Sequence, residues 1–187
     1  MKYFIDFEFI EGFHKPLFGK RRHFIDLISV GMVSEDNRAL YFLSSEYNYK
    51  DADQWVMENV ITKAYTKAVS GDARNRFDAT NFHKHYGIPV SEIAKKILRW
   101  LGADSNISFY GYYSDYDWVL FCSMFGRMID LPKGFPMYCR DVKQMMDDRG
   151  VDSCHPECPK QNGEHYALTD AAWNMAAYKW LITIPTK

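Results

Sequence analysis

The sequence has no apolar run long enough to cross a membrane. Its longest apolar runs are interrupted within about a dozen residues, whereas a helix that spans a bilayer needs roughly 20. Cysteine is scarce, and the four residues lack the dense, regular spacing of a secreted disulfide scaffold. The first residues do not resemble a signal peptide. These absences predict a protein without a membrane segment, in a reducing, cytoplasmic setting.

Net charge is also small. The 23 Lys and Arg residues nearly balance the 24 Asp and Glu residues, which leaves a formal charge of −1 at pH 7. This balance argues against a protein that coats long nucleic acid through bulk electrostatics, although it allows a local basic patch. The chain has 187 residues, of which 47% are hydrophobic and 17% aromatic, enough to build a core. We therefore expect one domain over residues 1–187.

Runs of β-branched and aromatic residues predict five strands. They cover residues 2–10, 26–33, 39–44, 106–113 and 137–139. The segment "SEDNR" predicts a hairpin turn between the second and third strands, so the first three strands are expected to be antiparallel. Helical patterns cover residues 54–65, 91–101, 115–125, 141–149 and 167–181. This order predicts an α/β fold in which helices flank a mixed five-stranded sheet.

The predicted helix over 91–101 has the clearest signals at its ends. Ser91 is expected to cap its start, and Gly102 to stop it. Apolar residues at helical spacing predict which side chains of this helix and the next one face the core. They are Ile93, Ile97, Leu98, Leu101, Val119, Leu120 and Met124.

Two acids stand in the first predicted strand. Asp6 and Glu8 are two positions apart, so they lie on the same face of the strand, inside an apolar run. Burying two charges that repel each other costs several kcal/mol unless a cation compensates, and hard divalent cations do this well. A solvated strand edge is the alternative explanation of the pair.

Further acids precede the helix over 115–125. Asp115 and Asp117 both stand at its start, where an Asp can serve only to cap the helix or to stabilise its dipole. We expect Asp117 to be the metal ligand, because it directly precedes the apolar face of the helix, whereas Asp115 suits the loop.

A third site opens the last predicted helix, in "EHYALTDAAWN". Asp170 is expected in the first turn of the helix and His165 on the loop before it. The carboxylate can then bind a metal while the imidazole reaches a water at the same centre. An exposed His and an Asp that stabilises the helix dipole are the alternative.

The three sites together resemble the motifs of the DEDD exonuclease superfamily, in the subclass whose last motif contains a histidine. The H-x-A-x-x-D element is matched by His165, Ala167 and Asp170. "YFIDFEFIEG" and "YGYYSDYDWVLFCSMFG" are similar to a small family of bacterial and phage 3′-5′ exoribonucleases, typified by a polyadenylate-specific enzyme and related to RNase T and oligoribonuclease. Phe9 replaces a Thr that many relatives have, and residues 12–23 replace a short turn.

The resemblance implies an RNase H-like fold and hydrolysis from the 3′ end of single-stranded RNA, with release of 5′-mononucleotides. It implies two Mg²⁺ or Mn²⁺ ions. Asp6 would bridge both ions, and Glu8, Asp117 and Asp170 would complete their shells. His165 would be the general base, a role that suits an imidazole. Many relatives form homodimers, so a homodimer is also expected.

Substrate contacts are expected near the first acidic motif. Lys20, Arg21 and Arg22, which follow Lys15 in a basic stretch, would bind phosphates, unless the stretch is an ordinary solvated loop. One of the apolar side chains beside the acids would pack on the terminal base, although Phe7 faces away from them and suits the core. These side chains are Phe7, Phe9 and Ile10.

Other interpretations stay open from the sequence. "CHPEC", over residues 154–158, suggests a zinc site, although one pair of cysteines is fewer than structural zinc usually has. The same loop could instead carry His165 toward the metals as a mobile cover. The enzyme could be a DNA exonuclease, since RNA selection depends on contacts to the 2′-OH that no short motif reveals. A binding module that has lost hydrolysis is a further alternative.

Overall fold

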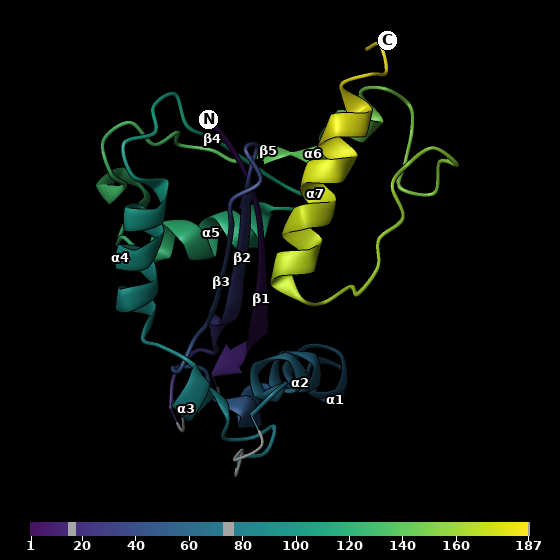
Figure 1. The fold of residues 1–187 in the computed structure, drawn as a ribbon. Helices are drawn as coiled ribbons and strands as arrows, with labels where there is room; N and C mark the ends of the chain where they lie inside the picture. The colour runs from purple at the N-terminus through teal and green to yellow at the C-terminus, as the bar shows by residue number, and fades with distance from the viewer. Residues whose placement is uncertain (15–17, 73–76, 187) are drawn as a thin grey trace.

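A five-stranded mixed sheet forms the centre of the molecule (Figure 1). The computed structural model describes residues 1–14, 18–72 and 77–186. The sheet order is β3-β2-β1-β4-β5, and β4 and β5 are parallel to β1. The sheet is mixed and β1 to β3 are antiparallel, as predicted. The strands are β1 (Lys2–His14), β2 (Arg22–Ser34), β3 (Ala39–Leu43), β4 (Ser108–Gly111) and β5 (Arg140–Asp141).

Helices cover both faces of the sheet. They are α1 (Gln54–Val56), α2 (Thr62–Val69), α3 (His83–Tyr86), α4 (Val90–Leu101), α5 (Asp115–Ser123), α6 (Val142–Asp147) and α7 (Ala167–Leu181). A π-helical turn, η2 (Met57–Ile61), joins α1 to α2, and two 3-10 turns are η1 (Tyr49–Asp51) and η3 (Met128–Asp130). In the described part of the chain, no helix is long and apolar enough to span a membrane.

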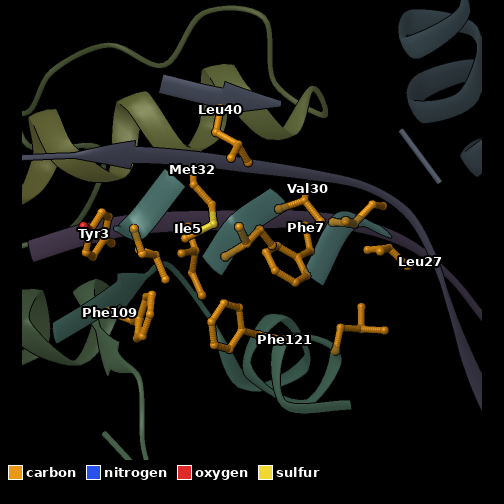
Figure 2. Packing of buried hydrophobic residues seen from close by; sticks show 13 residues of the cluster. Tyr3, Ile5, Phe7, Leu27, Val30, Met32, Leu40, Phe109 and Phe121 are labelled. Atoms are coloured by element: carbon orange, nitrogen blue, oxygen red, sulfur yellow. The ribbon is translucent and has the colours of Figure 1, made fainter. Parts of the chain in front are cut away.

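Side chains alternate along β1 between the two faces of the sheet, and they contribute to a separate layer of the core on each face. Tyr3, Ile5 and Phe7 point to the face covered by α4 and α5, where they pack in one buried cluster (Figure 2). Phe4 points to the opposite face, where α6 and α7 form a second cluster with it. Figure 1 shows α7 and α4 on opposite sides of the sheet. Because of this alternation, Asp6 and Glu8 are on the α7 side.

The hairpin of β1 and β2 is longer than the sequence predicts. Both strands have 13 residues, and His14 still pairs with Arg22. The stretch over 12–23, which looks like an insertion, therefore contains the end of β1 over residues 12–14 and the start of β2 over residues 22–23. Lys15 lies outside the described residues. The register shifts once, between Glu8 and Phe9.

Two helices differ from expectation in detail. Pro89, and not Ser91, is the residue before the first turn of α4, and no side chain caps this end. Gly102 does end the helix, in a backbone conformation with φ 62°. Leu98 and Val119 are exposed, contrary to prediction, because they lie on the solvent sides of α4 and α5.

The later elements are predicted well in type and less well in length. The strand expected over 106–113 is limited to β4, and the strand expected over 137–139 lies at Arg140 and Asp141 instead. Asp141 caps the start of α6 by accepting the N–H groups of Lys143 and Gln144. The last helix has the predicted bounds.

Candidate active site

Three carboxylates from the two ends of the chain meet beside the sheet. Asp6 and Glu8 project from β1 toward α7, and Asp170 lies in the first turn of that helix. One oxygen atom of each carboxylate lies within 4.8 Å of the other two. Asn174, one turn further along α7, is buried and donates from Nδ2 to the carbonyl oxygen of Ile5 at 2.8 Å. This hydrogen bond ties the helix to the strand that carries the two other acids.

The cluster is electrostatically strained when it holds only protein atoms. Burial raises the pKa of Asp6 well above its ordinary value, and the charges of Asp117, Glu8 and Asp170 raise it further. Burial and the charge of Asp170 raise the pKa of Glu8 to about 7, against the opposing charge of Lys63. A divalent cation would remove this repulsion.

Asp117 lies next to this cluster, near the start of α5. It is buried, whereas Asp115 is exposed. Asp115 is the first residue of α5 and does not lie in the loop before it, contrary to prediction. Oδ1 of Asp117 accepts a hydrogen bond from the backbone N–H of Phe7 at 3.1 Å. Burial raises the pKa of Asp117, and this hydrogen bond opposes that shift. Asp117 is not among the three acids whose oxygens lie within 4.8 Å, but its charge acts on Asp6.

Asp170 is held by three hydrogen bonds. Its Oδ2 accepts the N–H groups of His165 at 2.7 Å and of Tyr166 at 3.2 Å, and its Oδ1 accepts Nε2 of Gln161 at 2.8 Å. Burial raises the pKa of Asp170, and these donors oppose that shift. The carboxylate is therefore fixed in orientation by the loop that precedes α7.

His165 lies on that loop, in a left-handed backbone conformation with φ 64°. Its ring meets Trp55 of α1 edge to face, with 4.8 Å between the centroids, and its Nε2 lies 3.9 Å from Oε2 of Glu164. The imidazole is not one of the clustered ligands. The structure thus places His165 beside Asp170 through its backbone, with its ring half-buried against Trp55.

The donor set of the cluster fits hard divalent cations. Its ligand atoms are carboxylate oxygens, which suit Mg²⁺ and Mn²⁺ better than zinc. Among the residues that the structure describes, this is the one group of three or more potential ligands. The zinc site considered for residues 154–158 is not formed there: Cys154 is exposed and Cys158 is buried.

The three apolar candidates for substrate contact differ in exposure. The side chains of Phe7 and Ile10 are 3% and 1% exposed, which leaves them no surface to pack on a base. Phe7 packs on Phe121, as its direction in the strand predicts. Phe9 is half-buried, with Tyr116 edge to face at 5.6 Å between the centroids, and it lines a groove next to Glu8.

The three cations lie at the far end of the hairpin. Lys20, Arg21 and Arg22 are exposed. Arg22 pairs with His14, six residues beyond Glu8, which at about 3.4 Å per residue is roughly 20 Å along the strand. The structure therefore does not bring these cations to the carboxylates.

Sequence reasoning missed four residues around the acids. The ring of Trp55 packs on His165, the charge of Lys63 lowers the pKa of Glu8, and Gln161 donates a hydrogen bond to Asp170. No motif marks these three residues, because their contacts depend on the folded loops. Gly31 is different: a glycine inside a strand signals a close backbone approach, and here α7 begins over it.

Comparison of the whole structure finds a similar fold in solved proteins. It is similar to Pop2p of S. pombe in a Mg²⁺- and Mn²⁺-bound form, with a TM-score of 0.55 and 14% identity over 97% of this chain and 82% of that one. It is also similar to E. coli Exonuclease I in complex with a dT13 oligonucleotide, with a TM-score of 0.56 and 14% identity over 98% of this chain and 41% of that one. The chain thus shares its fold with both of these proteins.

Sequence comparison identifies the family. The chain is 32% identical over 186 residues to the 3′-5′ exoribonuclease Rv2179c of Mycobacterium tuberculosis strain H37Rv, covering 98% of this chain and 94% of that protein. The counterpart in strain CDC 1551 gives the same values. This chain belongs to the family of these 3′-5′ exoribonucleases. No family model matches the chain.

Proposed function

We propose that the protein is a 3′-5′ exoribonuclease that hydrolyses single-stranded RNA and releases 5′-mononucleotides. The observation that carries the proposal is the convergence of Asp6, Glu8 and Asp170 within 4.8 Å, in a chain of this family. Acids that repel one another in a partly buried site are costly in a pure binding module and useful in a metal-dependent hydrolase. This argues against the inactive module.

In this proposal Asp6, Glu8, Asp117 and Asp170 hold two Mg²⁺ or Mn²⁺ ions. Bound divalent ions supply an activated water and stabilise charge on the phosphoryl and leaving oxygens. Asp117 and Asp170 are presented in fixed orientations by the N–H of Phe7 and by Gln161. His165 takes the proton of the attacking water, and Trp55 limits the positions that its ring can adopt.

DNA is the competing substrate class, and the experiment includes both. Labelled RNA and DNA oligomers of one sequence are incubated with the protein with and without Mn²⁺, and with the 3′ or the 5′ end blocked. We expect Mn²⁺-dependent release of 5′-mononucleotides from RNA with a free 3′ end. Equal rates on DNA would contradict the RNA preference, and cleavage that a blocked 3′ end does not stop would contradict the direction.

The variant Asp6→Ala assigns the activity to these acids. We expect it to fold and to lose more than about 100-fold in rate, since the loss of even an outer partner of a metal ligand costs about 10- to 100-fold. Wild-type rates in the purified variant would contradict the assignment.

The single domain over residues 1–187, the homodimer and the cytoplasmic setting stay predictions.

A further inference from the structure

The distal half of the β1–β2 hairpin has features that the hydrolytic site does not use. We call residues 9–14 and 18–25 the arm. On one edge of β1, β2 pairs along the whole arm, but β4 pairs on the other edge only from Lys2 to Phe4. Within the described residues, no strand covers that second edge between Phe9 and His14. This edge of the arm is therefore not paired with a strand, and it starts next to Glu8.

A row of rings follows the arm away from the site. Tyr116, next to Asp117, contacts Phe9 at 5.6 Å and His23 at 6.4 Å between centroids. His23 in turn contacts Phe13 at 5.4 Å. Tyr116 is 42% exposed and Phe13 57%, so both present ring surface to solvent. Exposed rings in a row suit the bases of a single strand, because every base has a face that can stack.

A groove lies along two of these rings and one of the clustered acids. It has a volume of about 490 Å³, and its lining includes Glu8, Phe9 and Phe13. Two further acids also line it, and both have partners. Oε1 of Glu11 lies 3.0 Å from Nε2 of His23, and Oδ1 of Asp53 accepts the N–H of Val56 at 2.8 Å.

The end of the arm is basic. Lys20, Arg21 and Arg22 are exposed there, and Phe18 is 87% exposed beside them. Since the whole chain has a net charge of −1, this basic cluster is a local feature. Cations that follow a row of exposed rings are the combination by which proteins bind single-stranded nucleic acid.

We propose that the arm binds the part of a single-stranded RNA that lies 5′ of the cleaved nucleotide, several nucleotides from the carboxylates. The inference rests on the proposed function for its substrate class. The arm makes the enzyme prefer long strands, because a dinucleotide at the acids has no phosphate roughly 20 Å away for the cations to contact. Binding energy from this remote part of the substrate lowers KM for long RNA.

The test compares a 20-nucleotide RNA with a dinucleotide. The arm variant neutralises the three cations as Lys20→Gln, Arg21→Gln and Arg22→Gln. A matched control removes the same charge from exposed cations on another part of the surface, as Lys95→Gln, Arg99→Gln and Lys133→Gln. For each protein, kcat/KM is measured on both substrates, and binding of the long RNA is measured by fluorescence anisotropy in EDTA at several salt concentrations.

We expect the ratio of kcat/KM on long RNA to that on the dinucleotide to fall about tenfold in the arm variant and to stay unchanged in the control. The slope of log K against log salt should decrease by about 2, since each lost phosphate contact on a single strand removes about 0.7. Phe13→Ala should weaken binding about five- to tenfold without changing this slope.

A ratio and a salt slope that are the same in the arm variant and the control would overturn the proposal. So would equal losses on both substrates, because they would mean that the arm acts only on the hydrolytic site. Wild-type protein that hydrolyses neither RNA would refute the proposed function instead. The anisotropy measurement would still decide the role of the arm, because it needs no hydrolysis.

Discussion

Gly31 of β2 and Ala167 of α7 lie backbone against backbone. A Cβ atom on Gly31 would lie 2.1 Å from the carbonyl carbon of Ala167, much closer than non-bonded atoms approach. Gly31 is also the partner of Asp6 in the register of β1 and β2. The absence of a side chain at this position therefore lets α7 start close enough to the sheet for Asp170 to reach Asp6.

The variant Gly31→Ala tests this relationship. The methyl group meets backbone, which cannot rotate away, so α7 must shift and carry Asp170 with it. We expect a loss of about 1–3 kcal/mol in the free energy of unfolding, a Tm lower by about 2–4 °C for each kcal/mol, and a large loss of hydrolysis. Differential scanning calorimetry and a rate assay in Mn²⁺ measure the two effects. Wild-type values in both would show that the close approach is not needed.

Removal of one buried charge should stabilise the metal-free protein. The pKa of Asp6 is raised by burial and by its acidic neighbours, so its ionised form is unfavourable near neutral pH. We expect Asp6→Asn to raise the Tm in EDTA at pH 8 and to abolish activity in Mn²⁺. The exposed Asp115 offers the control, and Asp115→Asn should change neither. A lower Tm for Asp6→Asn in EDTA would contradict the repulsion.

Glu8 gives the pH dependence of stability. Its pKa is about 7 in the folded protein and has an ordinary value of 4.5, so the folded state binds the proton more tightly than the unfolded state. The contribution of Glu8 is therefore complete below about pH 4.5 and is lost as the pH rises to about 7, by at most about 3 kcal/mol. Relative to Glu8→Gln, the metal-free wild type should lose stability over this window. A constant difference between the two denaturation curves would contradict the shift.

His165 can be tested through rescue by hydroxide. We expect His165→Ala to lose about 10²- to 10⁴-fold in rate, the usual contribution of a general base, and to recover part of it at high pH. His155 belongs to the same long segment before α7 and lies against Trp180, so His155→Ala is the control and should keep its activity. A variant whose activity does not rise with pH would show that His165 has another role.

The acidic residues could be predicted because their positions follow from local rules. Residues two positions apart on a strand lie on the same face, so Asp6 and Glu8 are predicted to be neighbours before any fold is known. The sequence predicts Asp170 in the first turn of a helix, and it lies there. Asp6 and Asp170 are 164 positions apart, and the sheet and α7 bring them together. Only the resemblance to a family predicts that they share a site.

The parts that could not be predicted lack such local rules. The arm is exposed at Glu11, Phe13 and His14, so its apolar periodicity fades and its strands look shorter than they are. In α5, four apolar residues follow one another from Trp118 to Phe121, so the sequence could not show that Val119 is the exposed one. Trp55 reaches His165 only through the fold, across 110 positions of sequence.

The central claim is that the acids share divalent cations, and a crystal grown with Mn²⁺ tests it most directly. Anomalous scattering locates manganese without reference to the protein atoms. We predict two peaks, about 4 Å apart, within coordination distance of Asp6, Glu8, Asp117 and Asp170. A map with no anomalous peak among these carboxylates, or with manganese bound only elsewhere, would contradict the account.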